Sequence, residues 1–362
     1  MEPAASPPAS PEAAPSPRAP IVVRSASATH IGARAFNEDA LLERADLGLF
    51  VLADGAGGHG AGDVASQLAL QAIADAFEAS GVDRTERADV DTFGLYVDAR
   101  RLVSAIQHAN RAVMEQAKSQ NADKGMGTTV VAAFPAVGYG SIHIAHVGDS
   151  RCYRWREGLL ELLTEDHSLL HDVLETWPDM GDDVLKKLPR NVVTRALGMQ
   201  DPLRVTVRTN ELLPRDRYLL CSDGVTEALP RQRLHALLGE AKSAEEAART
   251  LVDAAWAAGA RDNITALVLI CEPALAGEGV GDGGVLTAMS QTLERAFLVP
   301  TGERESSEPG DVPRDDEPEI VILGVAEGPQ VVPRKEKRPD MDSNEDLGAE
   351  WREALDELTR KA

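Results

Sequence analysis

Four aspartates stand where apolar, strand-like runs end, and they are the residues best placed to do chemistry. They are Asp54 in VLADGAGGH, Asp149 in HVGDSR, Asp223 in LLCSDGV and Asp262 in RDNITALVLI. A carboxylate is rarely buried unless it is paired or bound to a metal. One such aspartate is an ordinary turn residue, but four at strand ends predict strands that converge on one site. Carboxylate oxygens are the ligands that hard cations such as Mg²⁺ and Mn²⁺ prefer.

The segment around Asp54 has two interpretations. Taken alone, DGAGGH is more simply a glycine-rich turn between a strand and a helix. Glycines also let a backbone approach a ligand closely, so the carbonyl of Gly55 could join the Asp54 carboxylate on a cation. The segment is not a nucleotide-binding P-loop, because no Lys-Ser/Thr pair follows it.

A second polar segment, RAFNEDA, carries an arginine and two adjacent acids ahead of a short strand. A lone segment of this kind is more often a solvated loop. In a metal site its residues gain roles, because the planar guanidinium of Arg34 can bind a phosphate through two donors. Glu38 and Asp39 could then hold metal-bound waters.

The composition excludes several classes of function. The 362 residues carry a net charge of −22, with 43% hydrophobic residues. This charge argues against a nucleic-acid groove and against an anionic membrane surface. The sequence has no apolar run of transmembrane length and no signal-peptide pattern.

Three cysteines, Cys152, Cys221 and Cys271, lie inside apolar runs, which predicts reduced, buried thiols in a cytoplasmic protein.

The pattern of apolar residues predicts an α+β domain over residues 21–272. Groups of strands with paired helices between them favour antiparallel sheets over strict βαβ alternation. Strands are expected at 21–28, 47–53, 127–134, 141–147, 152–156, 159–163, 203–208, 217–221 and 263–270. Helices are expected at 63–78, 97–119, 232–238 and 244–257. A tight hairpin is expected at Glu157-Gly158, and a capping box at Ser243 and Glu246.

Three further segments differ from this pattern. Residues 166–190 are polar, partly helical and interrupted by two prolines, which predicts a surface flap that carries specificity. Residues 1–20 and 273–342 have the composition of disordered segments, rich in proline and, in the second, acids. Residues 343–362 predict an amphipathic helix that either docks on its own domain or binds a groove on a partner. Residues 286–299 are a weaker helix candidate.

Eight motifs together resemble one family. The motifs are RAFNEDA, VLADGAGGH, GMGTT, HVGDSR, LTEDHS, VVTRALG, LLCSDGVTEAL and RDNITALVL. Their order and spacing are similar to those of the type 2C metal-dependent protein Ser/Thr phosphatases, in the glycine-rich bacterial form. The resemblance covers residues 21–272 and implies two packed antiparallel sheets flanked by helix pairs.

The resemblance also implies a set of metal ligands for two core ions, Mn²⁺ or Mg²⁺. Asp54 matches the bridging carboxylate and Gly55 the backbone-carbonyl ligand. Asp223 and Asp262 match the ligands of the second core ion. Asp149, together with Asp223, matches a weaker third-metal site.

The remaining family positions concern catalysis. Glu38 and Asp39 match the acids that hold metal-bound water, and Arg34 matches the arginine that grips phosphate. The implied reaction is direct attack of a hydroxide that bridges two metal ions on phosphoserine or phosphothreonine. Many eukaryotic members carry a histidine where this chain has Ala56. His59, three residues on, is expected to be structural, which leaves the general acid unassigned.

The expected function is therefore a cytoplasmic, monomeric phosphatase acting on Ser/Thr kinases and their phosphorylated protein substrates in a bacterium. A first alternative is a phosphatase dedicated to one regulatory protein of the anti-sigma-antagonist type. A second is a catalytically silent adaptor on the same fold, which loss of ligand acids would support. A third is an unrelated metal-binding β protein, against which Arg34 argues.

Removal of residues 343–362 tests whether the expected C-terminal helix serves only a partner. Its deletion should leave hydrolysis of a small phosphoester intact, because no motif lies within it. The rate of p-nitrophenyl phosphate hydrolysis, compared with the full chain, is the measurement. Lost activity would show that the segment supports the catalytic domain itself.

Overall fold

The computed structural model describes residues 21–57, 60–80, 94–119, 125–189, 192–274 and 292–294. Residues 1–20, most of 273–342, all of 343–362, and His59 lie outside this set. The predictions for those segments are therefore not addressed by the structure.

Six strands form the first sheet, here called sheet A, in the order β12-β1-β11-β10-β7-β8. The bounds are β1 (Ile21–His30), β7 (Arg151–Arg156), β8 (Leu159–Leu162), β10 (Arg217–Cys221), β11 (Ile264–Pro273) and β12 (Thr292–Glu294). Neighbours pair antiparallel, except that β12 runs parallel to β1.

The second sheet, sheet B, has the order β2-β3-β5-β6-β9, and β4 pairs with β3 beyond this path. The bounds are β2 (Asp39–Arg44), β3 (Leu49–Gly57), β4 (Met126–Thr128), β5 (Val130–Ala136), β6 (Ser141–Val147) and β9 (Thr206–Glu211). Its strands are antiparallel throughout.

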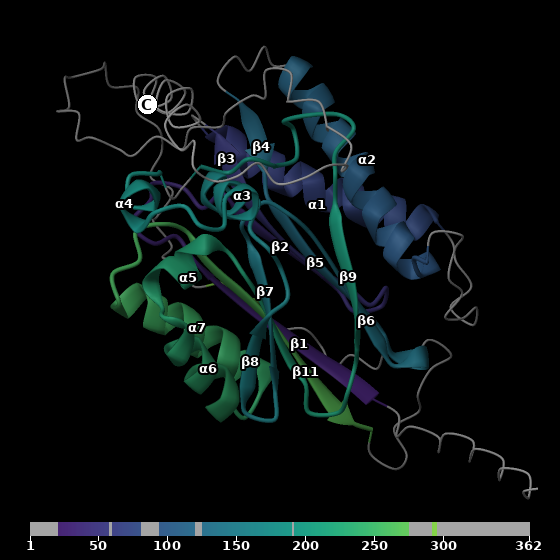
Figure 1. Cartoon of the computed structure of the whole chain (residues 1–362). Coiled ribbons are helices and arrows are strands. Elements are labelled where there is room, and N and C mark those ends of the chain that lie inside the picture. The colour runs from purple at the N-terminus through teal and green to yellow at the C-terminus, as the bar shows by residue number, and fades with distance from the viewer. Residues whose placement is uncertain are drawn as a thin grey trace, which may run out of the picture.

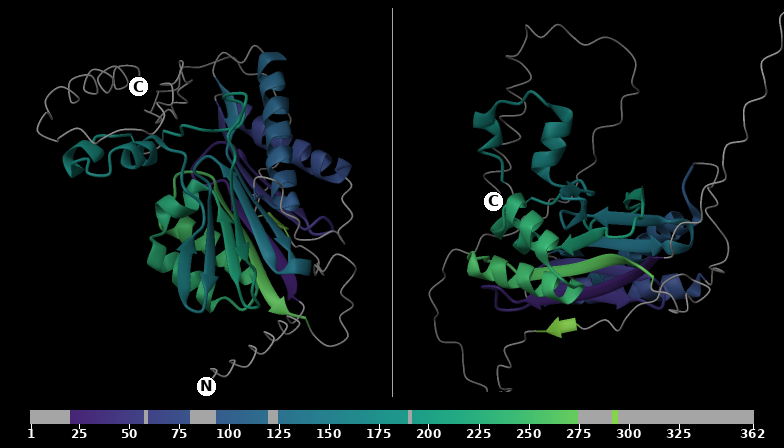
Figure 2. Two further views of the ribbon diagram at one scale, coloured as in Figure 1. Left: turned by 45° about the vertical axis from the view of Figure 1, so that its right-hand side comes forward. Right: turned by 90° about the horizontal axis from the view of Figure 1, so that it is seen from below.

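Helices cover the outer face of each sheet (Figures 1 and 2). On sheet B lie α1 (Ala61–Ala79) and α2 (Val97–Ser119), and on sheet A lie α5 (Asp223–Ala228), α6 (Arg231–Glu240) and α7 (Ala244–Ala257). The helices α3 (Leu169–Thr176) and α4 (Asp182–Leu185) fall within the expected flap, at one end of the sandwich. The predicted fold, two antiparallel sheets flanked by helix pairs, is confirmed.

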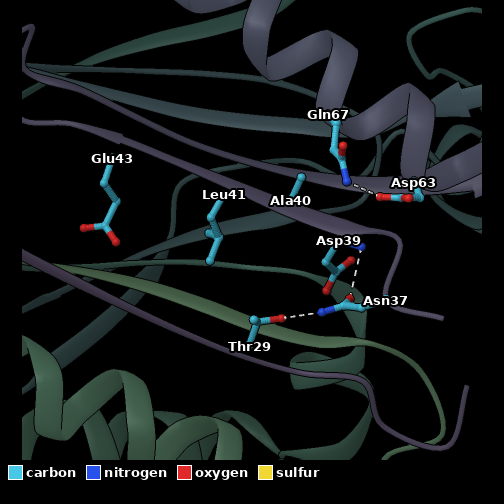
Figure 3. Close-up of a pocket in the computed structure, with 8 residues that line it drawn as sticks. All are labelled: Thr29, Asn37, Asp39, Ala40, Leu41, Glu43, Asp63 and Gln67. Carbon is cyan, nitrogen blue, oxygen red and sulfur yellow. Dashed lines mark hydrogen bonds between the residues drawn. The ribbon is translucent and has the colours of Figure 1, made fainter. Parts of the chain in front are cut away.

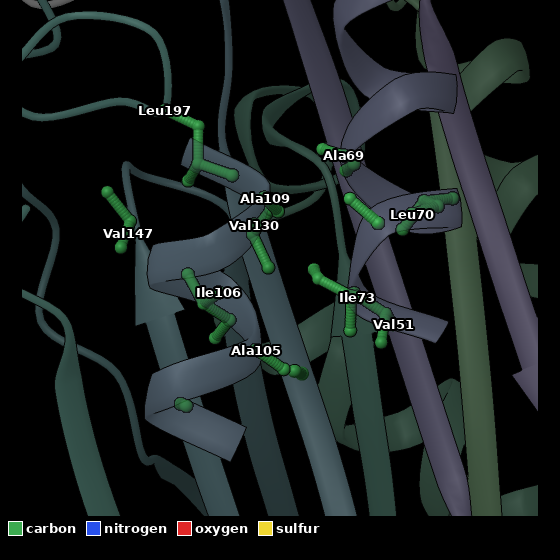
Figure 4. Packing of buried hydrophobic residues seen from close by; sticks show 14 of the residues in the cluster. Val51, Ala69, Leu70, Ile73, Ala105, Ile106, Ala109, Val130, Val147 and Leu197 are labelled. Atoms are coloured by element: carbon green, nitrogen blue, oxygen red, sulfur yellow. The ribbon is translucent and has the colours of Figure 1, made fainter. Parts of the chain in front are cut away.

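Three apolar layers hold the sandwich together. One lies between α1, α2 and sheet B, where Val51, Ile73 and Ile106 are fully buried (Figure 4). A second lies between sheet A and its helices, and a third lies between the sheets. Burial of such side chains stabilises a fold by about 1.5–3 kcal/mol each.

One local prediction from sequence is confirmed, and a second is confirmed in part. The β7–β8 hairpin turns through Glu157 and Gly158, both at positive φ (50° and 80°), as a two-residue turn of matching twist requires. The Ser243 side chain accepts a hydrogen bond from the backbone N–H of Glu246 at 3.1 Å. The reciprocal bond differs from a simple capping box, because the Glu246 carboxylate accepts from the N–H of Lys242.

Other expected bounds were wrong. β3 does not end before Asp54 but continues to Gly57, because Gly55–Gly57 pair with β4. The strand expected at 203–208 begins at Thr206, since Leu203 packs into the core and its carbonyl accepts from Gln107. Within the weak helix candidate 286–299, the described Thr292–Glu294 form a strand instead.

The three cysteines are free and buried, as predicted. Burial raises the pKa of the Cys221 thiol to about 12, so it stays protonated near neutral pH. In the described part of the chain, no helix combines the length and the apolar character needed to cross a bilayer.

Truncation of Ile106 to alanine tests the layer beneath α2. The side chain is fully buried, so the free energy of unfolding should fall by about 2–5 kcal/mol through lost burial and a residual cavity. Denaturant titration measures the change. Glu115→Ala, an exposed position on the same helix, should change stability by less than about 0.5 kcal/mol.

Candidate active site

Neighbouring strands of sheet B bring Asp39 and Asp54 together. The two residues are paired directly across β2 and β3, which puts both side chains on the same face. That face meets sheet A, because the Ser222 hydroxyl at the end of β10 donates to Oδ2 of Asp39 at 2.9 Å. The pair thus lies between the sheets, at the end where β10 finishes.

Sheet A supplies two more carboxylates at this end. Asp223 is the first residue of α5 and is separated from β10 by Ser222, and Asp262 directly precedes Asn263 and β11. Asp149 follows β6 of sheet B. Each predicted aspartate therefore stands at a strand end or within the last residues of a strand, and both sheets contribute.

These carboxylates lie close enough for their charges to affect one another. Burial raises the pKa of the Asp54 carboxyl well above its ordinary value, and the charges of Asp39, Asp223, Asp149 and Asp262 raise it further. Burial also raises the pKa of the Asp223 carboxyl well above its ordinary value, and the charges of Asp149 and Asp262 add to this rise. The structure thus brings all four sequence-predicted aspartates and Asp39 into one site.

The flanking acids are also perturbed. Burial raises the pKa of Asp39 to about 6, against hydrogen bonds from Thr265 and Ser222 that lower it. Burial likewise raises the pKa of Asp149 to about 6, and the Asp166 charge adds to the rise. Hydrogen bonds and, at Asp149, the Arg151 charge offset only part of these rises, and a bound cation would lower both pKa values further.

Two orphan oxygens point to oxygen-binding cations. Oδ1 of Asp39 and Oδ1 of Asp223 are buried and have no hydrogen-bond partner among the described residues. Such atoms are costly unless something pairs with them. The donor set of carboxylates and backbone carbonyls suits Mg²⁺ or Mn²⁺, so the residues present fit divalent ions.

The site is not preformed in every detail. In the described ranges, no group of three or more His, Cys, Asp or Glu side chains stands ready to hold an ion. Asp262 explains part of this, because its Oδ2 accepts from Nη2 of Arg34 at 2.8 Å and its Oδ1 from the N–H of Asn263. A cation at Asp262 therefore competes with the Arg34 guanidinium.

Asn263 joins the Arg34 loop to β11. Its amide nitrogen donates to the carbonyls of Ile31 and Phe36, both at 2.9 Å, and its amide oxygen accepts from the N–H of Glu38 at 2.9 Å. The residue is 5% exposed. One side chain thus holds the loop that carries Arg34 and Glu38 against the segment that carries Asp262.

Close backbone packing places Gly55 and Glu38. A Cβ on Gly55 would lie 2.2 Å from the carbonyl oxygen of Gly62, and Gly55 donates to the Glu38 carbonyl at 3.1 Å. Burial raises the pKa of Glu38 above its ordinary value, and the backbone N–H groups of Gly62 and Asp63 reduce this rise. Only glycine fits where these segments meet.

The turn with Asp149 is tied to the base of the expected flap. Gly148 donates to Nδ1 of His167 at 3.0 Å, and His167 donates its backbone N–H to the Gly148 carbonyl at 3.0 Å. Burial lowers the pKa of His167 to about 3, so the ring is neutral and can accept this bond. Asp166 forms a bidentate ion pair with Arg151. His167 therefore positions the turn rather than the substrate.

A cavity of about 300 Å³ opens beside Asp39, between β1, β2 and the start of α1 (Figure 3). Its lining residues are Thr29, Asn37, Asp39, Ala40, Leu41, Glu43, Asp63 and Gln67. In Figure 3 the Asn37 side chain lies between Thr29 and Asp39, bonded to both. The cavity is polar, and it reaches a catalytic candidate from the edge of the sandwich.

Sequence reasoning missed two positioning residues, Ser222 and Thr129. Thr129 accepts from the N–H of Asp54 at 3.2 Å and pairs with Ser150 at 2.7 Å. Both lie within recognised motifs, CSDG and GMGTT. A hydroxyl within such a motif could have suggested a hydrogen-bonding role. Their partners are distant in sequence and could not be foreseen.

Comparison with known proteins agrees with this geometry. The profile of the family described as protein phosphatase 2C matches residues 27–257. The chain is 35% identical over 221 residues to the Ser/Thr phosphatase Stp of Listeria welshimeri, covering 61% of this chain and 83% of that protein. It is 32% identical over 291 residues to the phosphatase PstP of Mycobacterium tuberculosis, covering 78% of this chain but only 53% of PstP.

Solved structures show the same fold. The PstP catalytic domain in complex with two manganese ions has 29% identity and a TM-score of 0.58, over 70% of this chain and 99% of that one. PppA of Pseudomonas aeruginosa has 33% identity and a TM-score of 0.57, over 69% and 98%.

The two-sheet sandwich with acids gathered at one end, together with its likeness to a manganese-bound phosphatase, identifies the class as metal-dependent phosphatases. The chain belongs to the protein phosphatase 2C family. The predicted enzyme class, a metal-dependent protein Ser/Thr phosphatase, is confirmed at this level.

Replacement of Asn263 by alanine tests its role as the link between loop and strand. Its loss leaves three backbone groups without their partner, so the free energy of unfolding should fall by about 1–3 kcal/mol. The free energy of unfolding, measured by denaturant titration, and the rate of phosphoester hydrolysis should both fall. Asn210→Ala is the matched control, because the Asn210 amide nitrogen is buried without a hydrogen bond; an equal loss in both variants would contradict the role.

Proposed function

We propose that Asp54, Asp223, Asp262 and the Gly55 carbonyl hold two divalent ions, Mn²⁺ or Mg²⁺, and that Asp149 contributes to a weaker third site. The observation that carries this assignment is the convergence of half-buried carboxylates from both sheets, in which Oδ1 of Asp39 and Oδ1 of Asp223 have no hydrogen-bond partner among the described residues. Buried like charges need a cation close by.

Such ions, when bound, supply an activated water nucleophile and positive charge against the phosphoryl oxygens. The chain's own residues then orient the reactants. Arg34 lies beside Asp262 with 39% of its side chain exposed, so its guanidinium can meet a phosphate that enters from solvent. Asp39, held by Ser222, and Glu38, held by backbone N–H groups, can each accept a hydrogen bond from water.

The substrates we propose are phosphoserine and phosphothreonine on proteins, including Ser/Thr kinases and their targets. The names of the Listeria and Mycobacterium relatives support the residue type. We propose further that the protein is a cytoplasmic, monomeric enzyme of a bacterium, and the bacterial relatives support the last point. Residues 343–362 remain a candidate binding helix for a partner.

The alternative, a catalytically silent adaptor, is disfavoured by the acids themselves. Loss of a ligand acid would be expected in such a protein, yet Asp54, Asp149, Asp223 and Asp262 are all present. The distinction therefore depends on a direct measurement of activity.

Replacement of Asp223 by asparagine tests the site. Hydrolysis of p-nitrophenyl phosphate and of a phosphothreonine peptide should require Mn²⁺ or Mg²⁺ and cease in EDTA. The variant should lose at least about 100-fold in kcat/KM, since its side chain keeps the shape but not the charge of a ligand. Steady-state rates are the measurement.

The matched control is Asp75→Asn on the exposed face of α1, which should retain the rate of the natural chain. If the folded natural chain shows no activity with either ion, the adaptor interpretation gains support.

A further inference from the structure

An exposed aromatic side chain stands beside the arginine of the site. Phe36 is 68% exposed, and Ile31, in the same loop, is 37% exposed. Among the described residues, most large apolar side chains are buried. An exposed phenylalanine at the rim of a charged site therefore indicates a binding function.

The loop presents this side chain from a fixed backbone. The carbonyls of Phe36 and Ile31 both accept from the Asn263 amide nitrogen at 2.9 Å. On the far side of Phe36, Asn37 donates to the Thr29 hydroxyl at 2.9 Å, and the N–H of Glu38 donates to Asn263. Figure 3 shows Asn37 directed toward Thr29 and Asp39.

Close packing holds the other end of the loop. Gly32 has a φ of +67°, and a Cβ there would lie 1.8 Å from the carbonyl oxygen of Asp262. The backbone on both sides of Arg34 is therefore anchored, while the Phe36 side chain remains in solvent. Because the backbone is already anchored, only the rotamer freedom of the side chain is lost when a ligand covers it, which favours binding.

The spacing fits a peptide substrate. Phe36 is two residues from Arg34, so their Cα atoms are at most about 7 Å apart. Adjacent residues of a substrate are about 3.8 Å apart. With a phosphate on Arg34, this spacing allows a residue that flanks the phosphorylated one to reach the Phe36 ring.

The chemistry of the rim indicates which flanking residue it favours. The Phe36 and Ile31 side chains offer apolar surface, and burying apolar surface is favourable.

We infer that Phe36, with Ile31, is a specificity-determining surface that favours phosphoproteins with an apolar residue next to the phosphorylated serine or threonine. The inference rests on the proposed function, because it takes Arg34 as the phosphate contact. It adds a sequence preference that the metal site alone does not supply.

Two phosphothreonine peptides test it, identical except that leucine or serine flanks the phosphothreonine on both sides. The quantity measured is the ratio of kcat/KM for the leucine peptide to that for the serine peptide, with saturating Mn²⁺. Because the ratio is taken within one variant, differences in folding or metal loading cancel. The natural chain should prefer leucine about fivefold, as expected when part of a leucine side chain leaves water.

Three variants complete the test. Phe36→Ala should bring the ratio close to one, and Phe36→Leu should retain most of the preference. Leu159→Ala is the matched control, since Leu159 is 74% exposed in the β7–β8 hairpin, at the opposite end of β7 from the Asp149 turn; its ratio should equal that of the natural chain.

The inference is overturned if the natural chain shows no preference, or if Phe36→Ala keeps it. Failure of the proposed function looks different. In that case neither peptide is hydrolysed by the natural chain in a manner that Mn²⁺ supports and EDTA abolishes, and both conclusions fall.

Discussion

The repulsion between half-buried carboxylates is the constraint on which the rest of the site depends. Asp39, Asp54, Asp149, Asp223 and Asp262 all raise the pKa of at least one neighbour or have their own raised. A fold gathers such groups only if its remaining interactions can hold them, or if cations join them. The three apolar layers supply the first condition, and the orphan oxygens of Asp39 and Asp223 indicate the second.

Backbone contacts, more than side-chain packing, set the spacing within the site. Gly32 lies against the Asp262 carbonyl, Gly55 against Gly62, and Gly224 against the carbonyl of Asn263. No other residue type fits at such distances. Neutral hydrogen-bonding side chains, Asn263 above all, then join these segments without adding charge to an already acidic region.

The sequence allowed the fold and the convergence of the four aspartates to be predicted, because each lies at or near one end of an apolar strand. It could not show that Arg34 pairs with Asp262, which is 228 positions away. The sequence also did not reveal that β3 continues through Asp54. The glycines in Gly55–Gly57 are typical of a turn, and only their pairing with β4 makes this segment a strand. Local patterns identify elements and motif residues, whereas the partners of Ser222 and Thr129 depend on how the sheets meet.

The hydrogen bond from Ser222 to Asp39 joins a residue of one sheet to a residue of the other. Asp54 lies on sheet B, whereas Asp223 and Asp262 adjoin strands of sheet A. The distances between the carboxylate oxygens of Asp54, Asp223 and Asp262 therefore depend on the separation and alignment of the two sheets. Catalytic sites tolerate errors of only about 0.5 Å, so a small sliding of one layer over the other changes the site as much as a substitution within it. The apolar layer between the two sheets therefore contributes to catalysis, because it prevents the sheets from sliding over one another.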